Sequence, residues 1–241
     1  MILGRLVWEL QRLLDNTSHD ATQTHLRSGR LSRNWAAVAR GAEDVFERRR
    51  TEDGIDSAVM VALDQSHSMC DNADDIIQAA LAVEMFNEAL KRCAGVASLI
   101  AGFANATDIV GLDVNGEHRE SRRASWKIYK GWREGAGVFS KRKESLNKTR
   151  GTTPDTAALQ DALKQCAARP EKRKVLIWIG DGDQYNARAA AALQRRYSDV
   201  VVIGVGIGAD LSKVFKHSVQ VNVASDLARA SFAAVQKALA A

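Results

Sequence analysis

Hydrophobic residues fall into short continuous runs along the chain, and amphipathic stretches separate these runs. A run without alternation is typical of a strand that is buried on both faces of a sheet. The runs predict four core strands and a short fifth strand, over residues 58–63, 96–103, 175–179, 200–205 and 219–223. Stretches with apolar residues every three or four positions predict helices over residues 73–92, 135–147, 153–168, 186–196 and 225–239.

Strands that alternate with helices indicate a mostly parallel sheet with helices on both faces. The chain therefore predicts an α/β fold of three layers, α/β/α, doubly wound around that sheet. Residues 109–114 and 125–129 predict two further short strands beside a turn at Asn115-Gly116. We expect the sheet to include one short antiparallel edge strand.

The beginning of the chain follows a different pattern. Apolar side chains recur on one helical face over residues 2–14, which predicts a helix. Residues 16–34 are polar and predict a loop. Residues 34–50 are compatible with a helix or with an ending in a short strand near Phe46.

The length of 241 residues fits one large domain, or one domain with an extension. We predict a helical N-terminal extension over residues 1–50, packed on a domain that comprises residues 51–241. The longest apolar run, residues 200–209, has 10 residues and contains three glycines. A membrane-spanning helix needs about 20 residues, so we expect none here.

Polar side chains follow the first and third core strands, where ligands bind in parallel α/β sheets. Asp64, Ser66 and Ser68 come directly after the first of these strands. Alternate side chains of an extended loop face the same way, so these three residues can present their oxygens to one point. Asp181 directly follows the third core strand.

Two adjacent threonines, Thr152 and Thr153, lie at the start of the helix between these strands, and Gly151 precedes them. Carboxylates and hydroxyls that require no thiol or imidazole form a hard oxygen site, which suits Mg²⁺ and its near-octahedral geometry. Two carboxylates alone would leave the ion incompletely neutralised. Its open position is then expected to favour a carboxylate from another molecule.

These residues resemble the metal-ion-dependent adhesion site of the von Willebrand factor A (VWA) family. The family pattern is Asp-x-Ser-x-Ser, then a Thr after a glycine, then an Asp in an Asp-Gly pair, and the chain has DQSHS, GTTP and DG in that order. The resemblance implies a VWA fold with a bound Mg²⁺ (or Mn²⁺) and an acidic partner residue on the metal. It places the ligands, direct or through water, at Asp64, Ser66, Ser68, Thr153 and Asp181, with Thr152 as the alternative threonine.

A closer resemblance is to the A-domain of the CobT-type subunit of cobaltochelatase, over roughly residues 25–241. It is carried by FERRRTEDGIDSAVMVALDQSHSM at residues 46–69, by AARPEKRKVLIWIGD at residues 167–181 and by VVIGVGIG at residues 201–208. A weaker similarity lies at Gly29-Arg30-Leu31. Three motifs in the right order, each at a predicted strand end, make this resemblance fairly specific.

The second resemblance implies a partner, a hexameric AAA+ ATPase of the MoxR/CobS type, with the A-domain protein as its non-catalytic adaptor. The chain resembles stand-alone proteins of this kind that bacterial and phage genomes encode beside a CobS-like ATPase. His67 departs from the family, which usually has a small residue between the two serines, and no long acidic region precedes residue 51. We therefore expect the metal site and the ATPase partnership without chelatase activity.

An enzymatic alternative uses the same strand ends. Asp181, with glycine on both sides, also resembles the last motif of haloacid-dehalogenase-type phosphatases, in which Asp64 would be the nucleophile. That family needs a second carboxylate two residues later as the general acid. The chain has Ser66 at that position.

The charge distribution suggests a third possibility. Residues 118–150 contain eleven Lys and Arg against three acidic residues, which gives them a net charge of +8. The whole chain has a net charge of +5, so the remaining residues carry −3. Trp126, Tyr129 and Trp132 are interleaved, as in a nucleic-acid surface, although a solvated face or a docking surface for an acidic partner has the same composition. The segment leads into the loop of Gly151, Thr152 and Thr153, here called the threonine loop. Its positive field would therefore steer an acidic partner toward the metal. This favours a protein partner over nucleic acid.

The three cysteines lie far apart and have neither disulfide-framework nor metal-finger spacing. Their pattern indicates a reducing compartment. We therefore expect a cytoplasmic protein, in a bacterial cell or in a phage-infected host cell.

Overall fold

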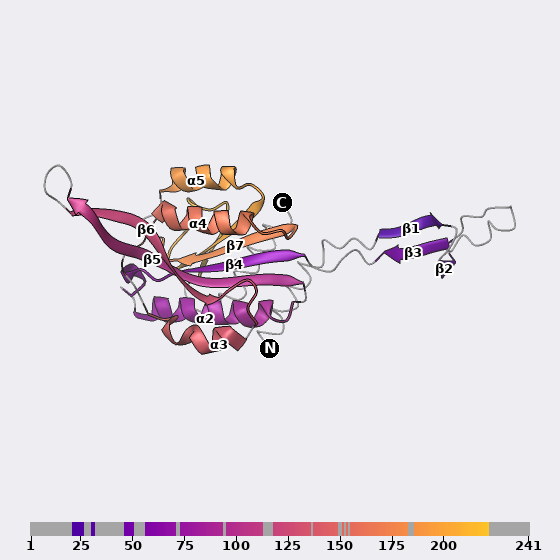
Figure 1. Cartoon of the computed structure of the whole chain (residues 1–241), viewed down its shortest axis with the longest axis horizontal. Helices are drawn as coiled ribbons and strands as arrows, with labels where there is room; N and C mark the ends of the chain where they lie inside the picture. The colour runs from indigo at the N-terminus through magenta and orange to yellow at the C-terminus, as the bar shows by residue number, and fades with distance from the viewer. Residues whose placement is uncertain are drawn as a thin grey trace.

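The computed structural model describes most of the chain between residues 56 and 221, together with three short strands before it (Figure 1). The described residues are 21–26, 30–31, 46–50, 56–70, 73–93, 95–112, 118–135, 137–148, 151, 153, 155–182 and 186–221. The helices predicted over residues 2–14 and 225–239 and the turn at Asn115-Gly116 lie outside these residues.

A six-stranded sheet forms the centre of the described structure. Its strands are β4 (Ser57–Asp64), β5 (Val96–Leu112), β6 (His118–Lys130), β7 (Arg173–Gly180), β8 (Val200–Ile207) and β9 (His217–Val221). They are ordered β6-β5-β4-β7-β8-β9, and every neighbouring pair is parallel except β5 and β6. The sheet is therefore mostly parallel with one antiparallel edge strand, as predicted.

Helices cover both faces of this sheet. In Figure 1, α2 and α3 lie on one face, and α4 and α5 lie on the other. The helices are α2 (Ala73–Leu90), α3 (Gly137–Arg142), α4 (Asp155–Ala167) and α5 (Ala187–Arg196), with short 3-10 helices η2 (His67–Cys70) and η3 (Lys143–Ser145). The predicted three-layer α/β/α architecture is confirmed. Within the described residues, no helix has the length and apolar character to cross a membrane.

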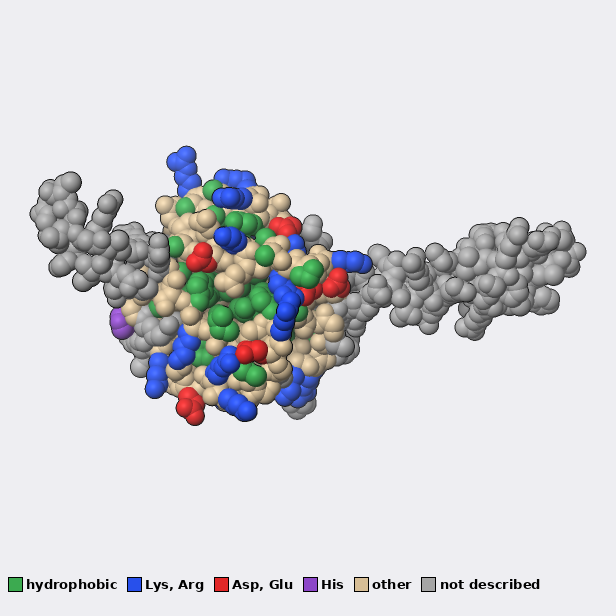
Figure 2. Space-filling model, viewed as in Figure 1, with side chains coloured by type: hydrophobic (Ala, Val, Ile, Leu, Met, Phe, Trp, Pro, Cys, Tyr) green, Lys and Arg blue, Asp and Glu red, His purple; other side chains and the backbone are tan. Residues whose placement is uncertain are grey.

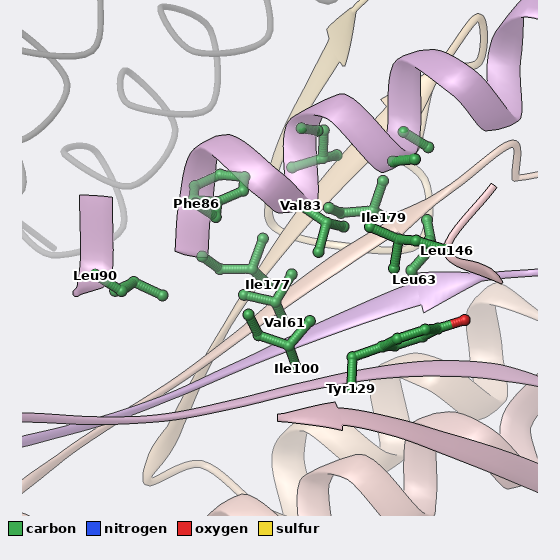
Figure 3. Packing of buried hydrophobic residues seen from close by; sticks show 14 of the residues in the cluster. Val61, Leu63, Val83, Phe86, Leu90, Ile100, Tyr129, Leu146, Ile177 and Ile179 are labelled. Atoms are coloured by element: carbon green, nitrogen blue, oxygen red, sulfur yellow. The ribbon is translucent and has the colours of Figure 1, made fainter. Parts of the chain in front are cut away.

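Strand β4 explains why a continuous apolar run suits the middle layer. All eight of its residues are buried. Val61 and Leu63 belong to the hydrophobic cluster that includes α2, whereas Met60 and Ala62 belong to the cluster that includes α4. Successive side chains of a strand point to opposite faces, so a strand between two helical layers needs apolar residues at every position. Figure 3 shows the first cluster, with side chains of β4 and β7 beneath Val83 and Phe86 of α2.

Strands β5 and β6 form a longer antiparallel hairpin than the sequence predicted. We expected separate strands over residues 96–103 and 109–114, but β5 is one strand of 17 residues. Its partner β6 has 13 residues, and two register shifts interrupt their pairing. Polar residues end the apolar run of β5, yet an antiparallel ladder satisfies backbone groups whatever the side chains are. The edge strand was thus predicted correctly in direction but not in length.

The described parts of residues 21–50 are strands rather than helices. They form a separate antiparallel sheet of β1 (Ala21–Leu26), β2 (Arg30–Leu31) and β3 (Phe46–Arg50), ordered β1-β3-β2. The loop predicted over residues 16–34 is therefore wrong where β1 and β2 lie, and the alternative of a strand near Phe46 is confirmed. The three strands are short, and their sequences show neither a long apolar run nor clear alternation of polar and apolar residues. The hydrophobic pattern therefore did not predict β1 and β2. The division of the chain at residue 50 stays a prediction.

Candidate metal centre

The loop after β4 brings three of the predicted metal ligands together. Asp64 is fully buried at the end of the strand, and Ser66 is 1% exposed. The backbone N–H of Ser66 donates to Oδ1 of Asp64 at 2.9 Å. The hydroxyl oxygens of Ser66 and Ser68 lie 2.9 Å apart. The aspartate thus holds its own loop in a turn. The two hydroxyls are adjacent, but Ser68 lies in the 3-10 helix η2 and not in the extended loop that the spacing predicted.

The parallel pairing of β4 and β7 places Asp181 at the same edge of the sheet. Leu63 is opposite Ile179 in the register, so Asp64 and Asp181 lie at the ends of neighbouring strands. Atom Oδ2 of Asp181 is buried, and no hydrogen-bond partner for it lies among the described residues. A buried carboxylate oxygen without a partner is costly, and a cation is one way to compensate it.

The threonine loop is attached to the loop after β4. The backbone N–H of His67 donates to the carbonyl oxygen of Gly151 at 2.8 Å. Gly151 has a φ of +66°, and a Cβ at this position would lie 2.8 Å from the carbonyl oxygen of Asn105. Only glycine tolerates both conditions. Thr153 follows two residues later and is half-buried, while Thr152 lies outside the described residues.

The residues at this edge fit a hard divalent cation. They offer two carboxylates and neighbouring hydroxyls, which are oxygen ligands of the kind Mg²⁺ prefers. Within the described residues, no three His, Cys, Asp or Glu side chains are placed to hold a metal ion, so a cation here would depend on hydroxyl oxygens as well. Asp64, Ser66, Ser68, Thr153 and Asp181 stay predicted ligands.

Sequence reasoning missed a buried amide at this site. Gln65, between the first two predicted ligands, has an exposure of 0%. Its side chain makes hydrogen bonds to Tyr129 of β6 and to backbone carbonyls just after α3. A lone glutamine in a loop carries no signal of burial in the sequence, because its partners lie at least 64 positions away.

In the basic segment, residues 118–150, three of the described Lys and Arg side chains are buried or paired with acidic side chains. Lys130 is 7% exposed, and its Nζ donates to the carbonyl oxygen of Ser98 at 2.7 Å. Arg142 pairs with Glu134, and Lys143 pairs with Glu84. In the view of Figure 2, Lys and Arg side chains of the described residues are interspersed with acidic side chains.

The aromatic residues of the basic segment contribute to the core. Tyr129 is fully buried, and Trp126 and Trp132 pack against the cluster of the α4 face. The Trp126 ring lies 5.5 Å from the Phe103 ring, centroid to centroid. The Arg169 guanidinium lies over the Trp132 ring at 4.8 Å. These rings are therefore engaged in the core and with Arg169, which weakens the hypothesis that they stack on nucleic-acid bases.

A mostly parallel α/β/α sheet with an Asp-x-Ser-x-Ser loop at the carboxyl end of its central strand defines the VWA class. The chain matches the family described as the VWA domain of the cobalamin biosynthesis protein CobT over residues 45–240. This match covers most of the sequence, so the chain belongs to the CobT VWA family. No curated protein sequence matches the chain.

Several solved structures share the fold at low sequence identity. Proximal thread matrix protein 1 from the mussel byssus, with a zinc-occupied metal-ion-dependent adhesion site, is 16% identical at a TM-score of 0.52 over 76% of this chain and 47% of that chain. The SpaC pilus adhesin of Lactobacillus rhamnosus GG is 12% identical at a TM-score of 0.53, over 76% and 30%. The PilB minor pilin of Streptococcus sanguinis is 11% identical at 0.51, over 82% and 65%. The chain thus spans about half the length of the mussel protein.

Proposed function

We propose that this protein is a Mg²⁺-dependent protein-binding module that serves as a non-catalytic adaptor for a AAA+ ATPase of the MoxR/CobS type. The metal, Mg²⁺ or Mn²⁺, would be held by Asp64, Ser66, Ser68, Thr153 and Asp181. When bound, the ion supplies a positive charge with an open position for an acidic side chain of the partner. The protein would work in the cytoplasm.

The observation that carries the proposal is the buried Oδ2 of Asp181, which faces no hydrogen-bond donor among the described residues. Asp64 is buried at the adjacent strand end, and its Oδ1 is already engaged by the N–H of Ser66. Two carboxylates at neighbouring strand ends would repel each other, and a cation bound between them would offset that repulsion. The mussel protein supports the same idea, since its site of this type holds zinc.

Membership of the CobT family supports the partner class. CobT is a cobaltochelatase subunit, and its resemblance to the present chain implies a CobS-type ATPase as partner. The basic segment lies next to the threonine loop in the chain, and its exposed members include Arg133, Lys141 and Lys148. Exposed positive charge near the site would accelerate the approach of an acidic partner.

A calorimetric titration tests the metal site. We expect the wild-type protein to bind Mg²⁺ and Mn²⁺, and the Asp64→Ala variant to lose that binding, because half of the carboxylate charge is removed. Asp161→Ala is the matched control, since Asp161 is an exposed aspartate of α4. Equal binding by wild type and Asp64→Ala would rule out the metal assignment.

A pull-down with a CobS-like ATPase encoded beside this protein tests the partner. We expect the complex to form in Mg²⁺ and to dissociate in EDTA, and the Asp64→Ala variant to behave like the EDTA sample. A complex that is unaffected by both treatments would show that the metal is not the contact.

The phosphatase alternative has less support from the geometry. The hydroxyl of Ser66, at the position of the required general acid, lies 2.9 Å from the hydroxyl of Ser68. A serine hydroxyl has far too high a pKa to protonate a leaving group as a carboxylic acid does. Turnover of a generic phosphomonoester that disappears in Asp64→Asn would favour the enzyme instead.

A further inference from the structure

The side chain of Gln65 links the loop after β4 to the segment that leads into the threonine loop. Its Nε2 lies 3.1 Å from the carbonyl oxygens of Ser145 and Leu146, and 3.0 Å from that of Lys148. It also lies 2.8 Å from the hydroxyl of Tyr129. One amide nitrogen thus faces three carbonyl oxygens at the end of η3 and one hydroxyl, all within hydrogen-bond distance.

The chemistry of these partners requires a donor at this position. The last carbonyls of a helix lack partners inside the helix and need donors from elsewhere. Gln65 supplies the two N–H groups of its amide, and the Tyr129 hydroxyl donates to the Ser145 carbonyl at 3.0 Å. An apolar side chain in place of Gln65 would remove the amide donor from the carbonyls of Leu146 and Lys148, which is unfavourable where these groups are buried.

The Gln65 side-chain amide occupies the space beside Gly102 of β5. A Cβ on Gly102 of β5 would lie 2.0 Å from Oε1 of Gln65 and 2.5 Å from its Cδ. No side chain fits in that space, so any residue larger than glycine at position 102 would displace the amide. The glycine therefore determines where the Gln65 side chain lies.

A second attachment lies farther along the same segment. The N–H of His67 donates to the carbonyl oxygen of Gly151 at 2.8 Å. The side chain of Gln65 thus contacts residues 145–148, and the backbone of His67 contacts Gly151. Asp64, Ser66 and Ser68 flank Gln65 and His67, and Thr153 follows Gly151 by two positions.

We propose that Gln65 is a positioning residue for the metal centre, which fixes the threonine loop relative to the loop of Asp64, Ser66 and Ser68. This inference rests on the metal site of the proposed function and assigns a role to a residue outside its ligand set. Ligands must be held in place before the ion arrives if binding is to be tight, and the buried amide provides that hold. Tyr129 of β6 completes the clamp.

The test compares two glutamines that both donate to backbone carbonyls. Gln65→Met removes the clamp, and Gln194→Met is the matched control, because Nε2 of Gln194 in α5 donates to the carbonyls of Ala190 and Val214 at 3.2 and 2.9 Å. We expect Gln65→Met to weaken Mn²⁺ binding about 10- to 100-fold, as for groups that orient metal ligands. We expect Gln194→Met to bind Mn²⁺ like wild type, even if its melting temperature falls as much as that of Gln65→Met.

A metal-free measurement separates this inference from the proposed function. We expect the backbone amide of His67 to exchange with solvent at least about tenfold faster in Gln65→Met than in wild type or Gln194→Met, because its acceptor segment is loosened. Should wild type bind no metal, the proposed function fails, while the exchange data still decide whether Gln65 positions the loop.

Tyr129→Phe provides the second variant in case Gln65→Met does not fold. It keeps the buried ring and removes the shared hydroxyl, so we expect a roughly fivefold loss of Mn²⁺ affinity and faster exchange at His67. Unchanged metal affinity together with unchanged His67 exchange, in a folded Gln65→Met or in Tyr129→Phe, would overturn the inference.

Discussion

The two faces of the central sheet are built from different side chains. The face beneath α2 and α3 is mainly aliphatic, as Figure 3 shows for Val61, Leu63 and the side chains around them. The face beneath α4 and α5 contains an aromatic row. The Trp178 ring lies 4.3 Å from the Phe103 ring and 6.3 Å from the Phe215 ring, centroid to centroid.

The difference bears on the candidate site, because residues of the aliphatic cluster bond to the side chain of Gln65. Tyr129 and Leu146 belong to the aliphatic cluster, and both also bond to Gln65. Packing on that face therefore bears on the position of the loop after β4. The aromatic row contributes buried area between β5, β7 and the segment after β8. We infer that the aliphatic face both stabilises the domain and helps to hold the Gln65 side chain, whereas the aromatic row mainly stabilises the domain.

The largest expected effect is on the aromatic face. Trp178 is fully buried, and Trp178→Ala should lower the free energy of unfolding by about 3–5 kcal/mol, because it removes the largest ring of the cluster and leaves a cavity. Denaturant unfolding measures this loss. The Mn²⁺ affinity of the folded variant should equal that of wild type. A matching loss of affinity would erase the distinction between the faces.

Leu63 offers the corresponding experiment on the aliphatic face. It is fully buried directly before Asp64, and Leu63→Ala should lower the free energy of unfolding by about 2–5 kcal/mol. Here we expect Mn²⁺ affinity to fall as well, about 10-fold, since the cavity lets the loop and Leu146 shift. Titration under conditions in which the variant is fully folded measures the second effect. Wild-type affinity in this variant would show that packing does not reach the ligands.

The smallest expected effect concerns Lys130, the last residue of the edge strand β6. Burial lowers the pKa of its ammonium group, and the nearby carboxylate of Glu134 opposes that shift. The unfolded chain therefore binds this proton more tightly than the folded chain. The resulting penalty is present below the folded pKa and disappears as the pH rises toward the ordinary value of 10.5.

Wild type should therefore gain stability relative to Lys130→Met as the pH is raised through that window. Denaturant unfolding of both proteins at a series of alkaline pH values measures the difference, and comparing the two cancels the titration of the other groups. Lys127→Met is the control, since Lys127 lies on the same strand and is only half-buried. A stability difference between wild type and Lys130→Met that does not change with pH would contradict the assignment.

Several elements could be predicted because their signal is local. The run of residues 58–63 predicted a core strand, and β4 covers it with two flanking residues. The hydroxyls of Ser66 and Ser68 do lie 2.9 Å apart, but a bend and the 3-10 helix η2 bring them together, and the extended loop assumed from the spacing is absent there. By contrast, β1 pairs with a strand about 20 residues away, and the far half of the hairpin is held by pairing that involves mainly polar residues, so neither leaves a periodic apolar trace.

The sequence by itself determined the layers of the fold, the family and the candidate ligands, because apolar runs and short motifs express burial and chemistry residue by residue. Only the tertiary structure decided that Gln65 is buried among carbonyls, that Lys130 and Tyr129 of the basic segment lie inside, and that Oδ2 of Asp181 lacks a donor among the described residues. These properties depend on which distant backbone groups meet a side chain. Such meetings follow from strand order and register, which no single segment encodes.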